Sequence, residues 1–278
     1  MKVLVLNCDD SRVWNREDGE FTFSKMFETC LCLSESIEWS TYDAFTFGEC
    51  VDQGKVKEEA NRMCSEYDIF IITGSRFNVD DEAPWFSLLY AIIVNVSMDG
   101  NKKLFGCCFG HQCIAHALGG KVSANPASRF VLKAELLHFN QDNLQSIFDT
   151  ANDIPASSNN SVTTSATCLC IESHGYCVSA LPQQALLLAS SETCQNEVFV
   201  AGDKLNIISC QGHPEFDLSY CIYENIYPAV VKKNKKLSDQ EVAIADSSFQ
   251  MYEASREKCS FLIEVLRRFL LTDCKCAL

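Results

Sequence analysis

The segment Lys103–Gly120, KLFGCCFGHQCIAHALGG, most constrains how this chain can fold. It reads as a short apolar strand, two cysteines between two glycines, and a helix that ends at a glycine pair. Gly106 and Gly110 permit the sharp backbone bend that a strand-to-helix turn requires. Such a turn presents its central residue, Cys108, at the N-terminus of the helix, where the helix dipole favours a thiolate. Cys107 is then expected to point back into the sheet as a packing residue.

Strand-like and helical runs alternate along the first half of the chain. We expect strands at Val3–Leu6, Ile37–Phe47, Ile69–Thr73 and Leu104–Cys107. Helices are expected at Phe21–Leu33, at Asp52–Tyr67, from Pro84 onward and at Gly110–Leu118. This β-α-β rhythm predicts an α/β fold with a mostly parallel central sheet flanked by helices.

The second half of the chain has a different texture. Short strand-like runs follow one another closely at Phe130–Phe139, Cys168–Glu172, Ala185–Ala189, Glu197–Ala201 and Leu205–Cys210, and they predict a smaller antiparallel segment. Residues 153–167, rich in Ser, Asn and Thr, are expected to form a surface loop without an assigned role.

From Leu218 onward the sequence becomes helical. Ser238–Glu241 reads as a capping box, and Phe261–Leu271 carries an apolar stripe that packing explains more readily than function. We expect this part to form helices packed on the outside of the sheet.

Charge and hydropathy exclude several classes of partner. A net charge of −14 over 278 residues, spread along the chain, repels phosphate backbones and anionic lipid. The run MKVLVLN lacks the features of a signal peptide, and Trp85–Val96 is too short to span a bilayer. We expect a cytoplasmic protein that binds neither nucleic acid nor membrane.

Seventeen cysteines raise the alternatives of a disulfide framework and a zinc site. The odd number and irregular spacing argue against disulfides. Cys30-x-Cys32, Cys168-x-Cys170 and Cys274-x-Cys276 leave one residue inside each pair, whereas thiolate zinc sites usually leave two to four. We therefore expect mostly small buried hydrophobes, and neither a metal nor a cofactor.

A cysteine nucleophile needs a base, and the chain has five histidines. His111 and His116 lie on the helix of the turn itself, and His138 lies in a strand-like run where packing or exposure is the usual fate. His213 follows an apolar strand in the segment Cys210–Glu215, CQGHPE, where the proline prevents a regular continuation. Sites of α/β folds gather at such strand ends, so His213 is the preferred base.

The carboxylate two residues further along completes the candidate site. An imidazole oriented by a carboxylate is what a cysteine nucleophile requires. Cys108, His213 and Glu215 are therefore the candidate nucleophile, base and orienting group.

The order of these motifs resembles a known family, the class I glutamine amidotransferases. Gly106–Gln112 resembles their G-x-C-x-G-x-Q elbow, and Gln211–Glu215, QGHPE, resembles their His-Pro-Glu motif. Three other segments resemble the first β-loop-α unit, the oxyanion strand and the substrate loop: Cys8-Asp9 with Gly19–Phe27, Ile72–Ser75 and Ser173–Gly175. The resemblance is to the free-standing branch that includes γ-glutamyl peptidases, and to the glutaminase domain of GMP synthetase.

The resemblance implies a flavodoxin-like α/β fold and a role for each matched residue. Cys108 would attack the γ-carbonyl, His213 would move protons, and Glu215 would orient His213. The backbone N–H groups of Gly74 and Phe109 would form the oxyanion hole.

The glutamyl end of the substrate is assigned in the same way to Gln112, Gly175 and Tyr176. Tyr176 is a departure, because many members of this branch carry Asp at that position, which puts the head-group contact in question. The resemblance also divides the chain into a catalytic domain over residues 1–217 and a C-terminal helical extension over residues 218–278, packed on the same domain.

The implied activity is a cysteine-dependent hydrolase that cleaves γ-glutamyl amide or peptide bonds of small molecules through a γ-glutamyl thioester. One alternative is a glutaminase subunit that supplies ammonia to a separate synthetase chain, because the sequence has no phosphate loop of the G-x-x-x-x-G-K-[ST] type. Another is a catalytically idle interaction protein, which the intact set of Cys108, His213 and Glu215 disfavours.

Overall fold

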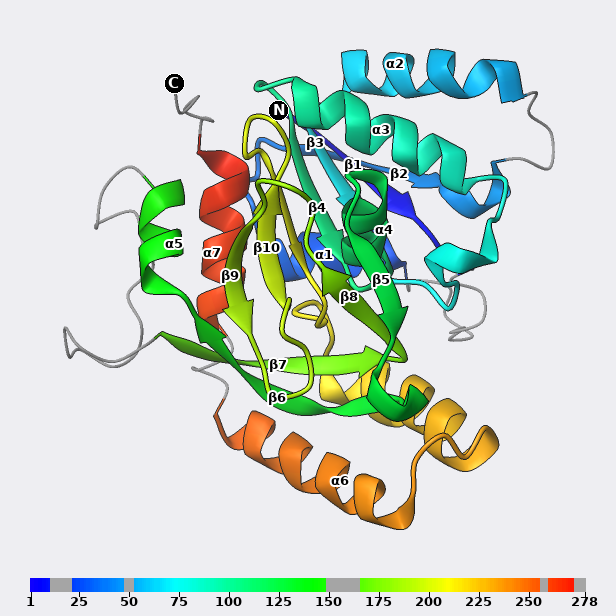
Figure 1. The fold of residues 1–278 in the computed structure, drawn as a ribbon, viewed down its shortest axis with the longest axis vertical. Helices are drawn as coiled ribbons and strands as arrows, with labels where there is room; N and C mark the ends of the chain where they lie inside the picture. Colours follow the sequence, from blue (N-terminus) through cyan, green and yellow to red (C-terminus); the bar gives the residue numbers. More distant parts are fainter. Residues whose placement is uncertain (11–21, 48–52, 149–165, 256–259, 273–278) are drawn as a thin grey trace.

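The strands of the first half, joined by Ile207–Cys210 of the second half, form the parallel part of one sheet (Figure 1). The computed structural model describes residues 1–10, 22–47, 53–148, 166–255 and 260–272, and within them this sheet has nine strands, in the order β2-β1-β3-β4-β11-β10-β9-β6-β7. The strands are Lys2–Asn7 (β1), Glu38–Asp43 (β2), Ile69–Ile72 (β3), Lys103–Cys107 (β4), Val131–Phe139 (β6), Thr167–His174 (β7), Leu186–Ser190 (β9), Val198–Ala201 (β10) and Ile207–Cys210 (β11). From β2 to β11 the neighbours pair in parallel, and from β11 to β7 they pair antiparallel. The predicted fold class is confirmed, and the antiparallel strands continue the same sheet. The assignment of Leu205–Cys210 to the antiparallel segment was wrong in part, because β11 pairs in parallel with β4 on one side and antiparallel with β10 on the other.

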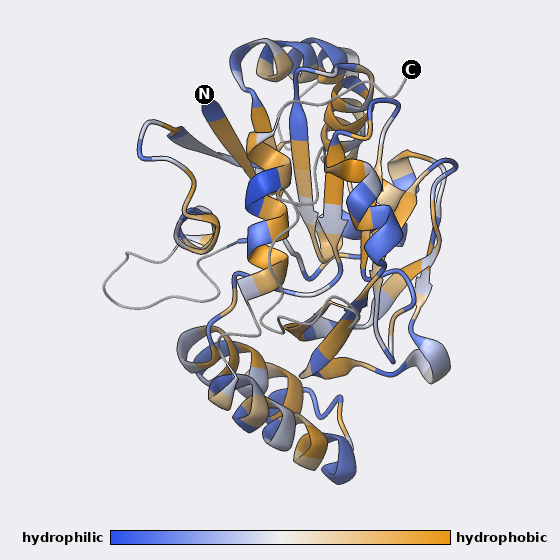
Figure 2. Cartoon of the chain, turned by 90° about the vertical axis from the view of Figure 1, so that its left-hand side faces the viewer, coloured by the Kyte–Doolittle hydropathy of each residue, from blue (hydrophilic) through white to orange (hydrophobic). Residues whose placement is uncertain are grey.

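Helices cover both faces of this sheet because side chains alternate along each strand. On β1, Val3 packs into the core beneath α1, α5 and α7, whereas Leu4 packs into the opposite core beneath α2, α3 and α4. The helices are Phe23–Leu31 (α1), Val56–Glu66 (α2), Phe86–Met98 (α3), Phe109–Ala117 (α4), Gln141–Ile147 (α5), Asp239–Ala254 (α6) and Ser260–Leu271 (α7). Figure 2 shows the strands largely apolar and the outer helices divided between polar and apolar residues.

The chain after β11 packs against β6 and β7. Two π-helical segments, η6 (Leu218–Ile226) and η7 (Pro228–Lys233), precede α6, and their buried side chains form a third core with those two strands. The predicted capping box is confirmed: Ser238 Oγ accepts from the N–H of Glu241, whose carboxylate accepts from the N–H of Ser238 at 2.8 Å. Helices α6 and α7 lie outside the sheet as predicted, and the division at residue 217 stays a prediction.

Some elements differ from the sequence-based expectations. The strand predicted over Ile37–Phe47 ends at Asp43, and a 3-10 turn over Ala44–Thr46 follows it. Helix α5 and the small antiparallel pair of β5 (Lys121–Ala124) and β8 (Tyr176–Ala180) were not predicted, because they are short and β5 is largely exposed. Most of the predicted loop over residues 153–167 lies outside the described residues.

Candidate active site

Cys108 occupies the sharp turn between β4 and α4. Its φ of 48° and ψ of −100° lie outside the regions that L residues adopt readily. A Cβ on Gly106 would overlap the side chain of Ile114, and one on Gly110 would overlap the backbone of Ile72. Only glycines therefore allow β4, β3 and α4 to approach so closely, and the turn lies where the glycine spacing predicts it.

His213 and Glu215 follow β11, the strand beside β4. His213 Nδ1 lies 2.8 Å from Glu215 Oε1, and the imidazole stacks on Phe216 with a centroid separation of 3.9 Å and an interplanar angle of 9°. The backbone N–H of His213 donates to Ile171 O at 2.8 Å, which ties this segment to β7. These three contacts fix the plane and the position of the imidazole.

The electrostatic surroundings favour the charged form of the imidazole. Burial alone would lower the pKa of His213, but the negative charges of Glu215 and of a Cys108 thiolate, with hydrogen bonds to both, raise it to about 10. These surroundings therefore favour the imidazolium form of His213 at neutral pH.

Cys107 is buried as predicted, but its side chain makes polar contacts that a packing role does not include. Its Sγ lies 3.3 Å from Glu215 Oε2, 3.4 Å from Gly212 O and 3.7 Å from His213 Nδ1. Burial, Cys210 and the charge of Glu215 raise the pKa of the Cys107 thiol well above its usual range. The protonated thiol therefore donates to Glu215 from behind the imidazole, which corrects the sequence-based expectation of plain packing.

Gly74 and Phe109 lie beside Cys108, the candidate nucleophile. A Cβ on Gly74 would lie 3.0 Å from His213 Cε1 and 3.7 Å from Cys108 Cβ, so the backbone of Gly74 passes directly along both residues. Phe109 is the first residue of α4, where backbone N–H groups have no partner within the helix. Within the described residues, neither N–H group donates a hydrogen bond. This arrangement suits an oxyanion hole, and that role stays a prediction.

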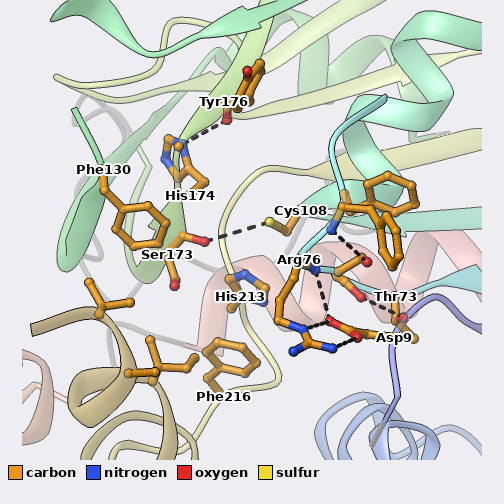
Figure 3. A pocket seen from close by; sticks show the side chains of 18 of the residues that line it. Asp9, Thr73, Arg76, Cys108, Phe130, Ser173, His174, Tyr176, His213 and Phe216 are labelled. Carbon is orange, nitrogen blue, oxygen red and sulfur yellow. Dashed lines mark hydrogen bonds and ion pairs between the residues drawn. The ribbon is translucent and has the colours of Figure 1, made fainter. Parts of the chain in front are cut away.

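The loop between β7 and β8 lies opposite Cys108. Cys108 Sγ lies 3.9 Å from the carbonyl oxygen of Ser173. Figure 3 marks this contact by a dashed line. The Gln112 side-chain amide donates to Tyr176 O at 2.9 Å and to Gln211 Oε1 at 3.2 Å. Gln112 therefore holds the loop in place, and contact of Gln112, Gly175 or Tyr176 with a substrate stays a prediction.

These elements surround one pocket of about 340 Å³. It is lined by all eight residues that the sequence singled out: Gly74, Cys108, Phe109, Gln112, Gly175, Tyr176, His213 and Glu215. In Figure 3, Phe130 and Phe216 stand on one side of Cys108, and the ion pair of Arg76 with Asp9 stands on the other.

Several residues around the pocket were not assigned a role from the sequence. Arg76 binds both carboxylate oxygens of Asp9, at 2.9 and 2.8 Å, which joins the loop after β3 to the loop after β1. His174 Nδ1 lies 3.0 Å from Tyr176 O, and its Nε2 lies 3.5 Å from a buried oxygen of Glu172. Burial lowers the pKa of His174 to about 4 and raises that of Glu172 well above its usual range. Asp9 and His174 lie within segments that the resemblance matches, but no role was assigned to them. The pairing of Asp9 with Arg76 joins two different loops, and the contact of His174 with Glu172 lies within β7.

The structure brings together one set of possible metal ligands that the sequence did not indicate. In the described part of the chain, Cys107, His213 and Glu215 bring one ligand atom each within 4.8 Å of one another. Neither Cys30-x-Cys32 nor Cys168-x-Cys170 joins such a group of three among these residues, and Cys274-x-Cys276 lies outside them.

Comparison with known proteins gives a consistent result. A family model described as "Glutamine amidotransferase class-I" matches residues 90–221. Gamma-glutamyl peptidase 3 of Arabidopsis thaliana is 32% identical over 227 residues, covering 76% of this chain and 83% of that protein.

Solved structures share the fold at lower identity. A glutamine amidotransferase of Thermotoga maritima superposes with a TM-score of 0.62 at 16% identity, over 98% of this chain and 99% of the other. One of Methylobacillus flagellatus gives a TM-score of 0.59 at 15% identity, over 96% and 94% of the two chains. Among the described residues, no helix has both the length and the apolar character needed to cross a membrane.

Proposed function

This chain belongs to the class I glutamine amidotransferase family, and we propose that it is a hydrolase that cleaves γ-glutamyl amide or peptide bonds through a thioester on Cys108. The observation that carries the proposal is the strained turn at Cys108 beside an imidazole that Glu215 orients at 2.8 Å. A nucleophile, a base and an orienting carboxylate in this order are the parts that acyl transfer through cysteine requires.

The first half of the proposed reaction forms the thioester. The Cys108 thiolate attacks the γ-carbonyl carbon, and the carbonyl oxygen becomes an oxyanion facing the N–H groups of Gly74 and Phe109. One such donor contributes about 3 kcal/mol to the transition state in comparable enzymes. The His213 imidazolium then gives its Nε2 proton to the leaving nitrogen, the C–N bond breaks, and the amine departs.

The second half hydrolyses the thioester. Neutral His213 takes a proton from water, the hydroxide adds to the thioester carbon, and the Cys108 thiolate leaves as glutamate forms. Glu215 keeps Nδ1 of the imidazole protonated and correctly oriented through both halves. The N–H of His213 and the S–H of Cys107 both point at Glu215, so its carboxyl group is held from two sides.

The far side of the pocket supports a leaving group larger than ammonia. The C-terminal segment contributes Ile226, Ala229 and Val230 to the lining of the pocket that contains Cys108, and Phe130 belongs to the same apolar cluster as Ile226 and Val230. The same segment adds the polar residues Asn225, Asn234 and Lys236 to the lining. An apolar wall cannot recognise ammonia, but it can stabilise an apolar amine or amino acid by excluding water. We therefore place the leaving group against this wall.

The decisive measurement is the turnover of γ-glutamyl dipeptides, glutathione and free glutamine by the purified chain alone. Clearly higher kcat/KM for γ-glutamyl peptides than for glutamine supports a free-standing peptidase. Turnover of glutamine alone, rising only when another chain is added, would favour the ammonia-supplying subunit instead. If glutamate is released from none of these substrates, the remaining alternative is a catalytically idle interaction protein.

Replacement of the three catalytic candidates tests the mechanism. Cys108→Ala is expected to abolish glutamate release, and His213→Ala to be nearly as damaging because the thioester needs a base. Glu215→Ala is expected to cost less, within the range of about ten- to ten-thousand-fold that triad members show. A Cys108→Ala protein that still turns over would remove the case for a thioester.

The leaving-group wall has its own test. Ala229 is exposed and lines the pocket, so Ala229→Asp adds a charge there without opening a core. We expect it to lower kcat/KM for γ-glutamyl peptides with apolar leaving groups and to affect glutamine much less. Met251→Asp, at a site 49% exposed on α6 and outside the pocket lining, is the control. Equal losses for both substrates would place the leaving group elsewhere.

A further inference from the structure

The pair of adjacent cysteines places a second thiol behind the catalytic imidazole. Cys108 reaches the pocket, whereas Cys107 lies on the other side of His213 with no exposed surface. The Sγ of Cys107, the Nδ1 of His213 and the Oε1 of Glu215 are separated by 3.7, 3.5 and 2.8 Å. These three atoms belong to a thiol, an imidazole and a carboxylate. Zinc binds all three kinds of group.

We propose that Cys107, His213 and Glu215 form an inhibitory zinc site. A point in the plane of the three atoms lies about 2 Å from each, and zinc binds nitrogen and oxygen at this distance and sulfur slightly further away. The ion therefore fits with only a small movement of Cys107 out of its present position. Three protein ligands leave the fourth position of a tetrahedral zinc ion to water.

The donor set selects zinc over the common hard cations. Magnesium and calcium require several oxygen ligands, and this site offers only one carboxylate. A zinc ion with one thiolate and one carboxylate is a neutral set, which suits a site where the side chains of His213 and Glu215 are only 5% and 3% exposed. Both of these residues line the pocket, so the ion reaches the site from the substrate side.

Binding displaces protons and blocks the base. The Cys107 thiol loses its proton to solvent, and the proton on His213 Nδ1 is replaced by the metal, as coordination of thiols and imidazoles requires. The imidazole then keeps only its Nε2 proton and cannot accept another, so it cannot activate water. The inhibition rests on the function proposed above, whereas the metal site itself does not.

Inhibition is measured with buffered free zinc in the γ-glutamyl hydrolysis assay, each variant being compared with its own zinc-free rate. The wild type is expected to be inhibited, and a chelator to restore activity. Cys107→Ala and Cys107→Ser are expected to raise the zinc concentration for half-inhibition by about tenfold or more. Cys113→Ala, which removes another fully buried thiol of the same region, is the control and should leave this concentration unchanged.

A second measurement is independent of turnover. Cobalt replaces zinc in such sites, and its thiolate ligands give a charge-transfer absorption band. The Cys108→Ala protein is expected to show this band. The control, in which Cys108→Ala is combined with Cys113→Ala, is expected to show it as well. The double variant of Cys108→Ala with Cys107→Ala is expected to lose most of it.

Two outcomes would overturn the proposal. Loss of the cobalt band in Cys108→Ala alone would mean that the metal binds between the nucleophile and the imidazole instead. Unchanged zinc inhibition in both Cys107 variants, with folding confirmed by circular dichroism, would show that Cys107 is not a ligand. If no substrate is turned over at all, the cobalt experiment still decides whether the site exists.

Discussion

The substitution Gly74→Ala tests how the position of the His213 imidazole affects activity, independently of the stability of the fold. The added methyl carbon would lie 3.0 Å from His213 Cε1, where ordinary contacts begin at about 3.4 Å, and 3.7 Å from Cys108 Cβ. The imidazole must therefore retreat by a few tenths of an ångström. The stacked ring of Phe216 at 3.9 Å and the hydrogen bond to Glu215 restrict where it can go.

The expected result is a loss of activity with little loss of stability. A displacement of about 1 Å can cost about a hundredfold in rate, so a smaller one predicts a loss of about ten- to a hundredfold in kcat. The backbone N–H of residue 74 is retained, so the oxyanion donor itself is unchanged. Replacing glycine by alanine also restricts the unfolded chain, which offsets part of the strain by about 0.4–1 kcal/mol.

The assay is steady-state hydrolysis of a γ-glutamyl peptide together with thermal unfolding of the same preparation. Gly100→Ala is the matched control, because a Cβ there would meet only Lys204 at 3.6 Å, far from the pocket. Wild-type kcat in Gly74→Ala would refute the tight contact with His213. A loss of activity that parallels a large fall in Tm would show that Gly74 acts through the fold instead.

Three further outcomes are expected. A glutamine-derived diazo-ketone should label Cys108 and leave Cys107 unmodified, because only the former lines the pocket; peptide mapping of the labelled protein decides this. Gly110→Ala should destabilise the fold by about 1–3 kcal/mol in denaturant unfolding, because the methyl group would overlap the backbone of β3. Since the folded-state pKa of His213 is raised from 6.5 to about 10, the stability that its pairing contributes is full below pH 6.5 and is lost as pH rises toward 10. The Tm difference between wild type and Glu215→Gln should therefore shrink over that pH range, and a constant difference would argue against an imidazolium at this position.

The sequence was most informative where a local pattern has a single geometric solution. Gly106 and Gly110 around Cys108 permit a tight strand-to-helix turn, and the structure has that turn at that residue. The apolar strands β3 and β4 of the parallel centre were predicted for the same reason, since each is buried along its whole length. β11 is equally buried, but its parallel pairing with β4 depends on a distant strand and was not predicted. His213 was found because it follows one of these strands.

The pocket walls were harder to predict because they depend on pairings between distant elements. Glu215 and Cys107 are 108 residues apart, and Arg76 and Asp9 are 67 apart. The wall near Ala229 comes from π-helical segments whose position depends on a core shared with β6 and β7. No periodicity within these segments indicates which strand they cover.

The two adjacent cysteines show how a local rule and a distant contact combine. Successive side chains at the end of a strand point to opposite sides, so the turn that presents Cys108 to the pocket must direct Cys107 away from it. The neighbouring strand, β11, pairs with β4 in parallel and delivers His213 between them. The imidazole of His213 therefore lies between Cys108, the proposed nucleophile, and the buried thiol of Cys107. A Cys107→Ala variant removes the buried thiol, with its contacts to His213 and Glu215, and leaves Cys108 in place, which is why zinc inhibition of this variant is compared with its own zinc-free rate.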